Sequence, residues 1–300
     1  MAVPPAIHRW VRAITSWYPF RIPAYGFNVV LSWLGFDGEQ PRWMLAAPRG
    51  TTPGLVLNVS NRYHRKLFYF LKAYWREACA EPLGEFLGKT LKPGGIFLDV
   101  GAHLGLFSFL AARLVGERGA VHAFEPDPLT VHSLRASSPH NGGHIHIHAV
   151  ALADEAGELP LFRAAVQAHS LVPSAGQDTR YTGDFAVVPV TTLDAWACQM
   201  NVDVSRIQAI KIDVEGFEAK TVAGAVGFLR RAGRPPIWCE VRGPAGSTRA
   251  PDTFRAVLSV LAPLGYLPFR WNGGALRSVE VCDVVGREDI LFCTSHAIAS

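Results

Sequence analysis

An acidic residue near the end of a short apolar run, and two glycines that follow the run, could hold a nucleotide-like ligand. Residues 96–100 are apolar except for Asp99, and Gly101 and Gly105 come next, four residues apart. This order predicts a strand, a tight turn and a helix. In open α/β sheets, nucleotide-like ligands bind at the carboxyl ends of the strands. Glycine in the turn matters because a side chain there would keep the ligand away from the main chain.

The spacing of these glycines distinguishes between two cofactors. Dinucleotide-binding folds carry G-x-G-x-x-G, which directs a helix N-terminus at a pyrophosphate. This chain carries G-x-x-x-G, with Asp99 before the first glycine. A carboxylate repels a pyrophosphate but attracts an ammonium or hydroxyl group. S-adenosyl-L-methionine (S-adenosylmethionine) has an amino-acid group and a sulfonium but no phosphate, so the turn favours it over NAD. The alternative is an ordinary turn in which Asp99 helps to cap the helix.

A second acid, Glu125, ends a second short predicted strand that begins at Val121, and it precedes Pro126 and Pro128. The two prolines end the strand and begin a helix. Glu125 would stand at the tip of the neighbouring strand, where its two oxygens can accept both ribose hydroxyls of the cofactor. An acid about 20 residues after a glycine turn also suits NAD. The structural alternative is a solvated acid at a strand end.

The string Lys-Ile-Asp-Val-Glu-Gly-Phe-Glu at residues 211–218 carries the residues best suited to catalysis. Lys211 and Asp213 share one face of a strand, and Asp213 stands at its tip. An alcohol acceptor is a weak nucleophile until it loses its proton, so a base accelerates methyl transfer to it. We therefore expect Asp213 and Glu215 to be the catalytic residues, with His103 and His169 as alternative bases.

Four strings of residues are similar to the successive motifs of the FkbM family of S-adenosylmethionine-dependent methyltransferases. The resemblance covers roughly residues 75–295. The strings are Asp-Val-Gly-Ala-His-Leu-Gly (99–105), Phe-Glu-Pro-Asp (124–127), Thr-Leu-Asp (192–194) and Ile-Lys-Ile-Asp-Val-Glu-Gly-Phe-Glu (210–218). The last string is the most specific to the family. One departure is His103, which stands where many relatives carry Asn and is also polar.

The resemblance implies a fold, a reaction and a binding site. The implied fold is α/β: a Rossmann-like, doubly wound seven-stranded sheet (class I methyltransferase) with one antiparallel strand at its edge. The implied reaction is O-methylation of a hydroxyl on a sugar, glycolipid or secondary metabolite. The residues expected to bind the methyl donor are Asp99, Gly101, His103, Gly105, Glu125, Ala151 and Asp154. Ala151 and Asp154 are expected beside the adenine, although Asp154 could instead be a turn aspartate.

Three alternative functions stay open. N-methylation and a catalytically inactive cofactor-binding scaffold would both keep the fold and the cofactor site. An NAD(P)-dependent oxidoreductase is disfavoured by Asp99 and by the glycine spacing.

A metal ion is a further candidate for the site. Glu240 lies in the run at residues 238–242, which ends the next predicted strand, so Asp213 and Glu240 would lie at neighbouring strand tips. In catechol-type O-methyltransferases, acids at the corresponding strand ends hold magnesium. By analogy these two residues are candidate ligands for Mg2+. The alternative is that they only orient the methionyl amine or the substrate. Glu218 is expected to be structural, because acids stabilise the first turn of a helix.

The elements that must position these residues alternate as in a doubly wound fold. Strands are predicted at 96–100, 121–125, 145–150, 208–214, 236–241, 266–271 and 289–295, the last two antiparallel to each other. Helices are predicted at 79–91, 105–115, 128–136, 192–200, 217–231 and 252–263. Residues 159–162 and 185–190 are expected to form an inserted hairpin. The loop between them offers His169, Ser170 and Arg180 as candidates for substrate contact.

The composition indicates one catalytic domain, at residues 75–300, with an extension at residues 1–74. The 300-residue chain is 49% hydrophobic and 18% charged, with a net charge of +4, as in a globular protein. Its first 80 residues hold ten Lys and Arg against three acids, and five of the eight tryptophans. This basic, Trp-rich extension is expected to cap the substrate cleft or, alternatively, to make peripheral membrane contact.

The same composition bounds the partners and the compartment. The mild charge and the lack of a zinc-finger or aromatic-basic motif argue against a nucleic acid partner, which leaves a small-molecule or glycan acceptor. The uncharged stretch at residues 22–36 has 15 residues, too few to span a bilayer. Five scattered cysteines without a C-x-x-C pair indicate free thiols and therefore a cytoplasmic location.

Overall fold

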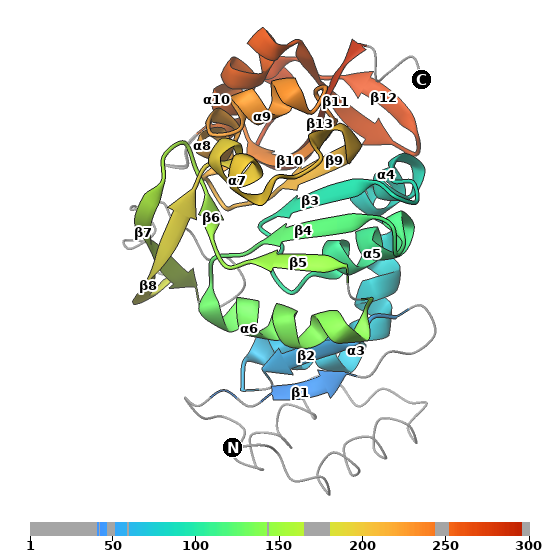
Figure 1. The fold of residues 1–300 in the computed structure, drawn as a ribbon, viewed down its shortest axis with the longest axis vertical. Coiled ribbons are helices and arrows are strands. Elements are labelled where there is room, and N and C mark those ends of the chain that lie inside the picture. The colour runs from blue at the N-terminus through green and yellow to red at the C-terminus, as the bar shows by residue number, and fades with distance from the viewer. Residues whose placement is uncertain are drawn as a thin grey trace, which may run out of the picture.

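An eight-stranded mixed sheet lies at the centre of the computed structural model, which describes residues 41, 43–46, 52–58, 60–142, 144–164, 181–243 and 252–295. The strands are arranged in the order β12-β11-β13-β10-β9-β3-β4-β5 (Figure 1). Their bounds are Ile96–Val100 (β3), Ala120–Phe124 (β4), Ile145–His148 (β5), Ile207–Ile212 (β9), Ile237–Arg242 (β10), Tyr266–Asn272 (β11), Ala275–Ser278 (β12) and Arg287–Thr294 (β13). Strands β10, β9, β3, β4 and β5 pair in parallel, so their carboxyl ends share one edge of the sheet.

Helices cover both faces of this sheet. One face carries α7 (Leu193–Met200), α8 (Glu218–Ala223), α9 (Val226–Arg231) and α10 (Thr253–Leu261), and the other carries α3 (Arg62–Ala80), α4 (Pro82–Thr90), α5 (Leu106–Val115) and α6 (Pro128–Ser137). Because side chains alternate along a strand, β3 contributes Leu98 and Val100 to one core and Phe97 to the other. Among the described helices, none has both the length and the apolar character needed to cross a membrane.

The doubly wound fold predicted from the sequence is confirmed, and every strand predicted for the central sheet is present within two residues at each end. The helix predicted at 217–231 is two helices, α8 and α9, separated by Gly224. A side chain at Gly224 would place its Cβ 1.9 Å from the carbonyl oxygen of Ala153, so only glycine fits at this position. Helix α9 then begins anew, and the Asp194 carboxylate accepts hydrogen bonds from the backbone N–H groups of Gly227 and Phe228 at its start.

The position of the antiparallel strand differs from the prediction. Strand β13 runs antiparallel to both β10 and β11 and lies between them, not at the edge. The edge is formed by β12, an eighth strand that pairs antiparallel with β11. Strand β12 is short and mostly exposed, so its sequence lacks the apolar run that would have predicted it. The predicted antiparallel pairing of the last two strands, β11 and β13, is confirmed.

A second, three-stranded sheet stands beside the carboxyl ends of the central strands (Figure 1). It contains β6 (Ala151–Leu152), β7 (Gly157–Ala164) and β8 (Tyr181–Thr191), and β7 pairs antiparallel with β8. The inserted hairpin is therefore confirmed, with longer strands than predicted. His169, Ser170 and Arg180 lie outside the described residues.

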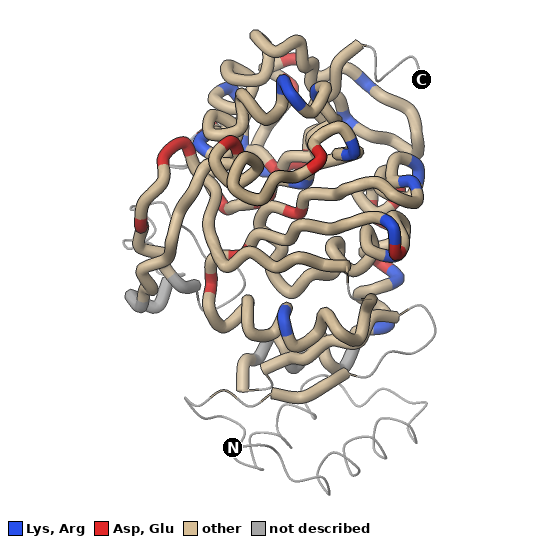
Figure 2. The backbone as a smooth tube through the Cα atoms, viewed as in Figure 1, with Lys and Arg blue, Asp and Glu red and all other residues tan. Residues whose placement is uncertain are grey.

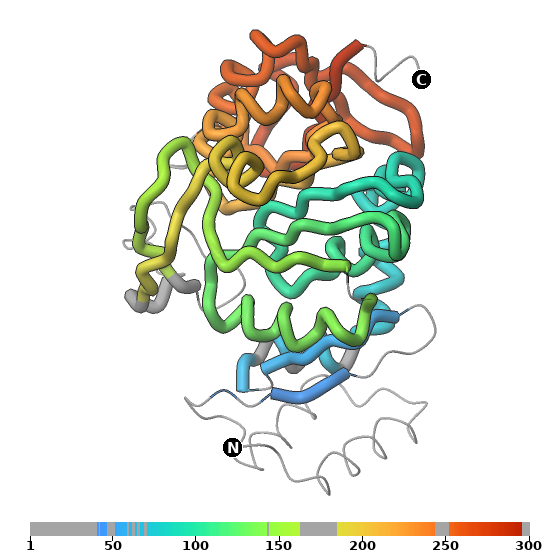
Figure 3. The backbone as a smooth tube through the Cα atoms, in the orientation of Figure 1, coloured from blue at the N-terminus to red at the C-terminus, as the bar shows by residue number. Residues whose placement is uncertain are grey.

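The described part of the N-terminal extension packs at one end of the molecule, and the last strands lie at the other (Figure 3). Strands β1 (Trp43–Ala46) and β2 (Leu55–Asn58) form an antiparallel pair, and β2 packs against α6 and α3. The expected boundary after Tyr74 falls inside α3. The division into extension and catalytic domain stays a prediction, and residues 1–40 lie outside the described part of the chain.

Buried charge is confined to the motifs seen in the sequence. Most charged residues lie on helices, loops and strand ends (Figure 2). In the described part of the chain, the buried aspartates, glutamates and lysine are Asp99, Glu125, Asp127, Lys211 and Glu218. Charges are buried only where partners compensate for the lost hydration, so these residues mark the region to examine for function.

Candidate functional site

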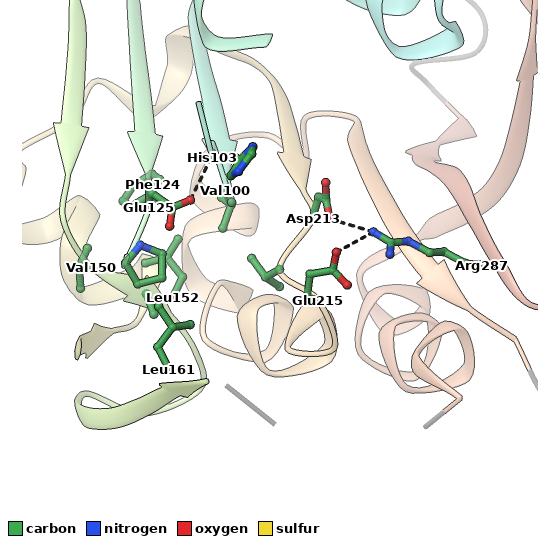
Figure 4. Close-up of a pocket in the computed structure, with 14 residues that line it drawn as sticks. Val100, His103, Phe124, Glu125, Val150, Leu152, Leu161, Asp213, Glu215 and Arg287 are labelled. Carbon is green, nitrogen blue, oxygen red and sulfur yellow. Dashed lines mark hydrogen bonds and ion pairs between the residues drawn. The ribbon is translucent and has the colours of Figure 1, made fainter. Parts of the chain in front are cut away.

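A cavity of about 250 Å³ opens at the carboxyl ends of β3, β4 and β9. On one side Glu125 lies with a set of mostly apolar residues, and on the other side three charged residues face it (Figure 4). The first set is Phe124, Glu125, Pro126, Val150, Ala151, Leu152 and Leu161; the second is Asp213, Val214, Glu215 and Arg287; Val100, Gly101 and His103 lie between them. The predicted residues Gly101, His103, Glu125, Ala151, Asp213 and Glu215 thus come together around one cavity.

The glycine turn brings bare main chain to this cavity. Gly101 has a φ of 78°, and a Cβ there would lie 1.8 Å from the carbonyl oxygen of Asp213. His103 also has a positive φ, 50°, and its N–H donates to Glu125. Gly105 caps the start of α5 with a φ of 82° but does not line the cavity. Its role is close packing, because a Cβ there would meet the Leu134 side chain at 2.4 Å.

Asp99 lies beneath the turn and not in the cavity wall, so the direct cofactor contact expected for it stays a prediction. Its side chain is 1% exposed, because alternation along β3 directs it toward α5 and away from the cavity. The Ser108 hydroxyl donates to it at 2.6 Å, and the Lys211 Nζ lies 3.2 Å away. Lys211 also donates to the carbonyl oxygen of Gly101 at 2.8 Å, so Asp99 and Lys211 together support the turn.

Glu125 is 6% exposed, and both of its oxygens already accept one backbone hydrogen bond. The N–H groups of His103 and Asp127 donate to them, each at 2.9 Å. Burial raises the pKa of Glu125 to about 7, and the charge of Asp127 adds to this effect, while the backbone hydrogen bonds and Lys211 oppose it. A carboxylate has about four lone-pair positions, so each oxygen can accept one more donor from a ligand.

The apolar side of the cavity contains side chains that were not among the expected cofactor-binding residues. Phe124 comes from β4, Val150 and Leu152 from the segment around β6, and Leu161 from β7. The apolar residues around β4 and β7 predicted strands there. They did not show which side chains of those strands would reach the site. Asp154 does not line the cavity: it is exposed and pairs with Lys220 at 3.7 Å. Its expected place beside the adenine stays a prediction.

Asp213 and Glu215 lie on the charged side. Glu215 has a φ of 52° and Gly216 a φ of 107°, so the chain turns sharply after β9. The carboxylate of Glu215 pairs with Arg242 at 3.1 Å and with Arg287 at 2.8 Å. Asp213 is held more loosely, with the Lys211 Nζ at 3.7 Å and the Arg287 guanidinium at 3.9 Å.

Glu240 joins this cluster from the end of β10, although it does not line the cavity. One oxygen each of Asp213, Glu215 and Glu240 lie within 4.8 Å of one another. Burial raises the pKa of Glu240, and the nearby charge of Asp213 raises it further. The Arg287 Nε lies 2.5 Å from Glu240. The sequence did not single out Arg287, because its place depends on where β13 enters the sheet.

Glu218 has the structural role expected for it. Its side chain is buried and accepts a hydrogen bond from the backbone N–H of Gly216 at 2.8 Å. Burial raises its pKa. Glu218 therefore stabilises the turn that presents Asp213 and Glu215.

Comparison with known sequence families gives a match over the part of the chain that carries most of these residues. Residues 99–268 match the sequence family described as the methyltransferase FkbM domain. A curated relative, the 31-O-demethyl-FK506 methyltransferase FkbM of Streptomyces tacrolimicus, is 28% identical over a 161-residue alignment that covers 46% of this chain. The match spans 62% of that relative's length.

Two solved structures of methyltransferases are similar to this chain at low sequence identity. The putative rRNA-methylase from Clostridium thermocellum is 13% identical with a TM-score of 0.41, covering 71% of this chain and 94% of its own. The O-methyltransferase from Bacillus cereus in complex with SAH is 13% identical with a TM-score of 0.40, covering 71% of this chain and 80% of its own.

Proposed function

Since this chain belongs to the family defined by the methyltransferase FkbM domain, we propose that it transfers a methyl group from S-adenosylmethionine to a hydroxyl oxygen. The acceptor we propose is a sugar, a glycolipid or a secondary metabolite. The observation that carries the proposal is the two-sided cavity, with Glu125 and an apolar wall on one side and Asp213 and Glu215 on the other. This polarity matches a ligand with a nucleoside at one end and a sulfonium at the other.

The adenosine half of the donor fits the apolar side. Phe124, Leu152 and Leu161 offer apolar contacts for the adenine. Each oxygen of Glu125 would accept one ribose hydroxyl in addition to its backbone donor. At the turn, Gly101 presents bare main chain to the cavity, where the methionyl part would lie.

Methyl transfer is an in-line displacement, in which the acceptor oxygen bonds to the methyl carbon as the carbon–sulfur bond breaks. The bonding pair stays on sulfur, the sulfonium becomes a neutral thioether, and the hydroxyl proton passes to a base. The protein's main contribution is to align the two reactants. Removing the proton makes the acceptor oxygen a better nucleophile.

We assign proton acceptance to Asp213 and acceptor positioning to Glu215. Asp213 is 36% exposed and its cationic partners are 3.7 and 3.9 Å away, whereas Glu215 is 18% exposed and held by two arginines at 2.8 and 3.1 Å. A carboxylate that two guanidinium groups hold by short hydrogen bonds is fixed in position, which suits it to orient an acceptor. The catalytic role of both residues is part of the proposal.

The charge of the cavity also supports a small-molecule or glycan acceptor over a nucleic acid. Asp213 and Glu215 present carboxylates where an acceptor would approach, and a phosphate backbone would be repelled there. Cytoplasmic location and contact of the N-terminal extension with a membrane stay expectations from the sequence.

The candidate magnesium site is not used in the proposed reaction. Asp213, Glu215 and Glu240 offer carboxylate oxygens at a suitable spacing. However, the Arg287 guanidinium already pairs with all three, so the donor set fits a bound cationic side chain better than a metal ion.

The proposal is tested with S-adenosylhomocysteine and a labelled methyl donor. We expect calorimetry to show binding of S-adenosylhomocysteine, and Glu125→Ala to weaken it by about 10- to 100-fold, because a hydrogen bond to a charged group contributes about 1.5–3 kcal/mol. Asp213→Asn should keep this binding and lose transfer of label to a hydroxylated acceptor. The matched control is Glu117→Ala, an exposed residue outside the cavity lining. Binding of NAD with no response to S-adenosylhomocysteine would contradict the proposal.

A further inference from the structure

The antiparallel direction of β13 brings a basic side chain to the acidic edge of the sheet. Strand β13 begins at Arg287, and its first residue lies opposite Arg242, the last residue of β10. A parallel strand in this place would present its carboxyl end to the site instead. Arg287 therefore reaches the same edge as Asp213 and Glu240, and its side chain points into the cluster (Figure 4).

The guanidinium of Arg287 contacts three carboxylates at once. Its Nε lies 2.5 Å from Glu240, and its terminal nitrogen lies 2.8 Å from Glu215 and 3.9 Å from Asp213. The three carboxylates are also close to one another, with one oxygen of each within 4.8 Å of the others. Without a cation between them, such carboxylates would repel one another.

The charge balance leaves little attraction for a second cation. Lys211 pairs with Asp213, and Arg242 pairs with Glu215, in addition to Arg287. A divalent ion entering the cluster would have to displace the guanidinium and would lie close to two further positive side chains. Arginine suits this place because its planar fork binds several carboxylate oxygens in a fixed geometry, which lysine does not do.

We propose that Arg287 is a positioning residue that takes the place of a divalent cation among Asp213, Glu215 and Glu240 and holds the first two toward the methyl acceptor. The positioning role rests on the proposed methyl transfer, whereas the replacement of a metal ion does not. Two consequences follow. The wild-type protein has no bound divalent ion at this cluster, and removal of Arg287 creates a site for one.

Binding of Mn2+ tests the replacement directly. The electron paramagnetic resonance signal of the free ion is measured with the wild-type full-length protein, Arg287→Ala and the control Arg277→Ala, which removes an exposed arginine of β12. We expect wild type and Arg277→Ala to leave the signal unchanged. We expect Arg287→Ala to bind Mn2+ at least about tenfold more tightly than wild type, and Arg287→Ala/Asp213→Asn to lose this binding, because hard cations prefer carboxylate oxygens.

The inference would be overturned if the wild-type protein bound Mn2+ and Asp213→Asn abolished that binding. This measurement does not depend on the folding of an Arg287 variant. A folded Arg287→Ala that fails to gain Mn2+ binding would overturn it too.

Kinetics test the positioning role. We expect Arg287→Lys to lower kcat about 100-fold, because a displacement of about 1 Å in a catalytic group has an effect of this size. Its affinity for S-adenosylhomocysteine should stay within about threefold of wild type, since Glu125 and the apolar wall are unaltered. Chelation with EDTA should leave wild-type activity unchanged. An unchanged kcat in Arg287→Lys would overturn the positioning role. Absence of S-adenosylhomocysteine binding in wild type would instead remove the proposed function, and the Mn2+ result would stand apart from it.

Discussion

Glu125 connects burial with ligand chemistry at a single residue. Its pKa is raised to about 7 by burial, so the folded protein retains this proton over a range in which the unfolded chain has lost it. The stability that Glu125 contributes is therefore fully present below its ordinary pKa of 4.5 and is lost as the pH rises toward about 7. A ligand that donates two hydroxyls favours the ionised form and works in the opposite direction.

The affinity for S-adenosylhomocysteine should consequently rise with pH and level off above about pH 7. Below that value we expect a change of up to about tenfold per pH unit, because binding requires loss of one proton. Calorimetry at several pH values measures it. Glu125→Gln should remove this component and Glu117→Gln should retain it. A wild-type affinity that is independent of pH, or that falls as the pH rises, would contradict the prediction.

The residues that the sequence could identify are those whose role depends on local order. The turn at Gly101, the acid at Glu125 and the pair Asp213 and Glu215 follow directly from where strands end, and the family resemblance read from them is confirmed. Asp99 and Asp154 do not line the cavity, because the direction of a side chain depends on which element packs beside it. Arg287 was missed because no local pattern connects it to the site.

Among the elements, α7 and α9 are joined by one carboxylate. Asp194 belongs to α7, but its oxygens accept the N–H groups of Gly227 and Phe228 at the start of α9. This explains why the chain can begin a new helix after Gly224. The sequence predicted one continuous helix, because the helical pattern continues across the break and a capping residue from another element leaves no local sign.

Asp194→Ala should lower the free energy of unfolding by about 1–2 kcal/mol, the usual effect of removing an N-cap residue. Asp194→Asn should lose less, because its carbonyl oxygen can still accept one of the two hydrogen bonds. Urea unfolding of both variants measures this, with the exposed Glu155→Ala as control. Equal losses for Asp194→Ala and Asp194→Asn would show that charge, not hydrogen bonding, holds the start of α9.

In the protein as a whole, the hairpin of β1 and β2 is attached far from the cavity. Asn141 accepts a hydrogen bond from the N–H of Gly54 at 3.1 Å and donates to its carbonyl oxygen at 2.8 Å. Ser137 accepts from the N–H of Val56 at 2.8 Å. Side chains at the end of α6 thus satisfy main-chain groups beside and within β2. No described residue before Val100 lines the cavity.

Asn141→Ala should therefore loosen the hairpin without changing the site. We expect hydrogen exchange at Gly54 to become faster, consistent with a loss of about 1–3 kcal/mol for unsatisfied buried groups, and the affinity for S-adenosylhomocysteine to stay the same. The exposed Asn272→Ala is the matched control. A weaker affinity in Asn141→Ala would show that the hairpin contributes to the site and would favour the cap predicted for the N-terminal extension.

The insertion of β13 between β10 and β11 has a consequence for folding kinetics. Strand β11 precedes β13 in the chain but has no hydrogen-bonded place in the main sheet until β13 lies beside β10. During synthesis, β11 and β12 therefore cannot join the main sheet until β13 has left the ribosome. Loops that close over long sequence separations make such steps slow. The charged side of the cavity, which needs Arg287, is consequently completed only in the final stage of folding.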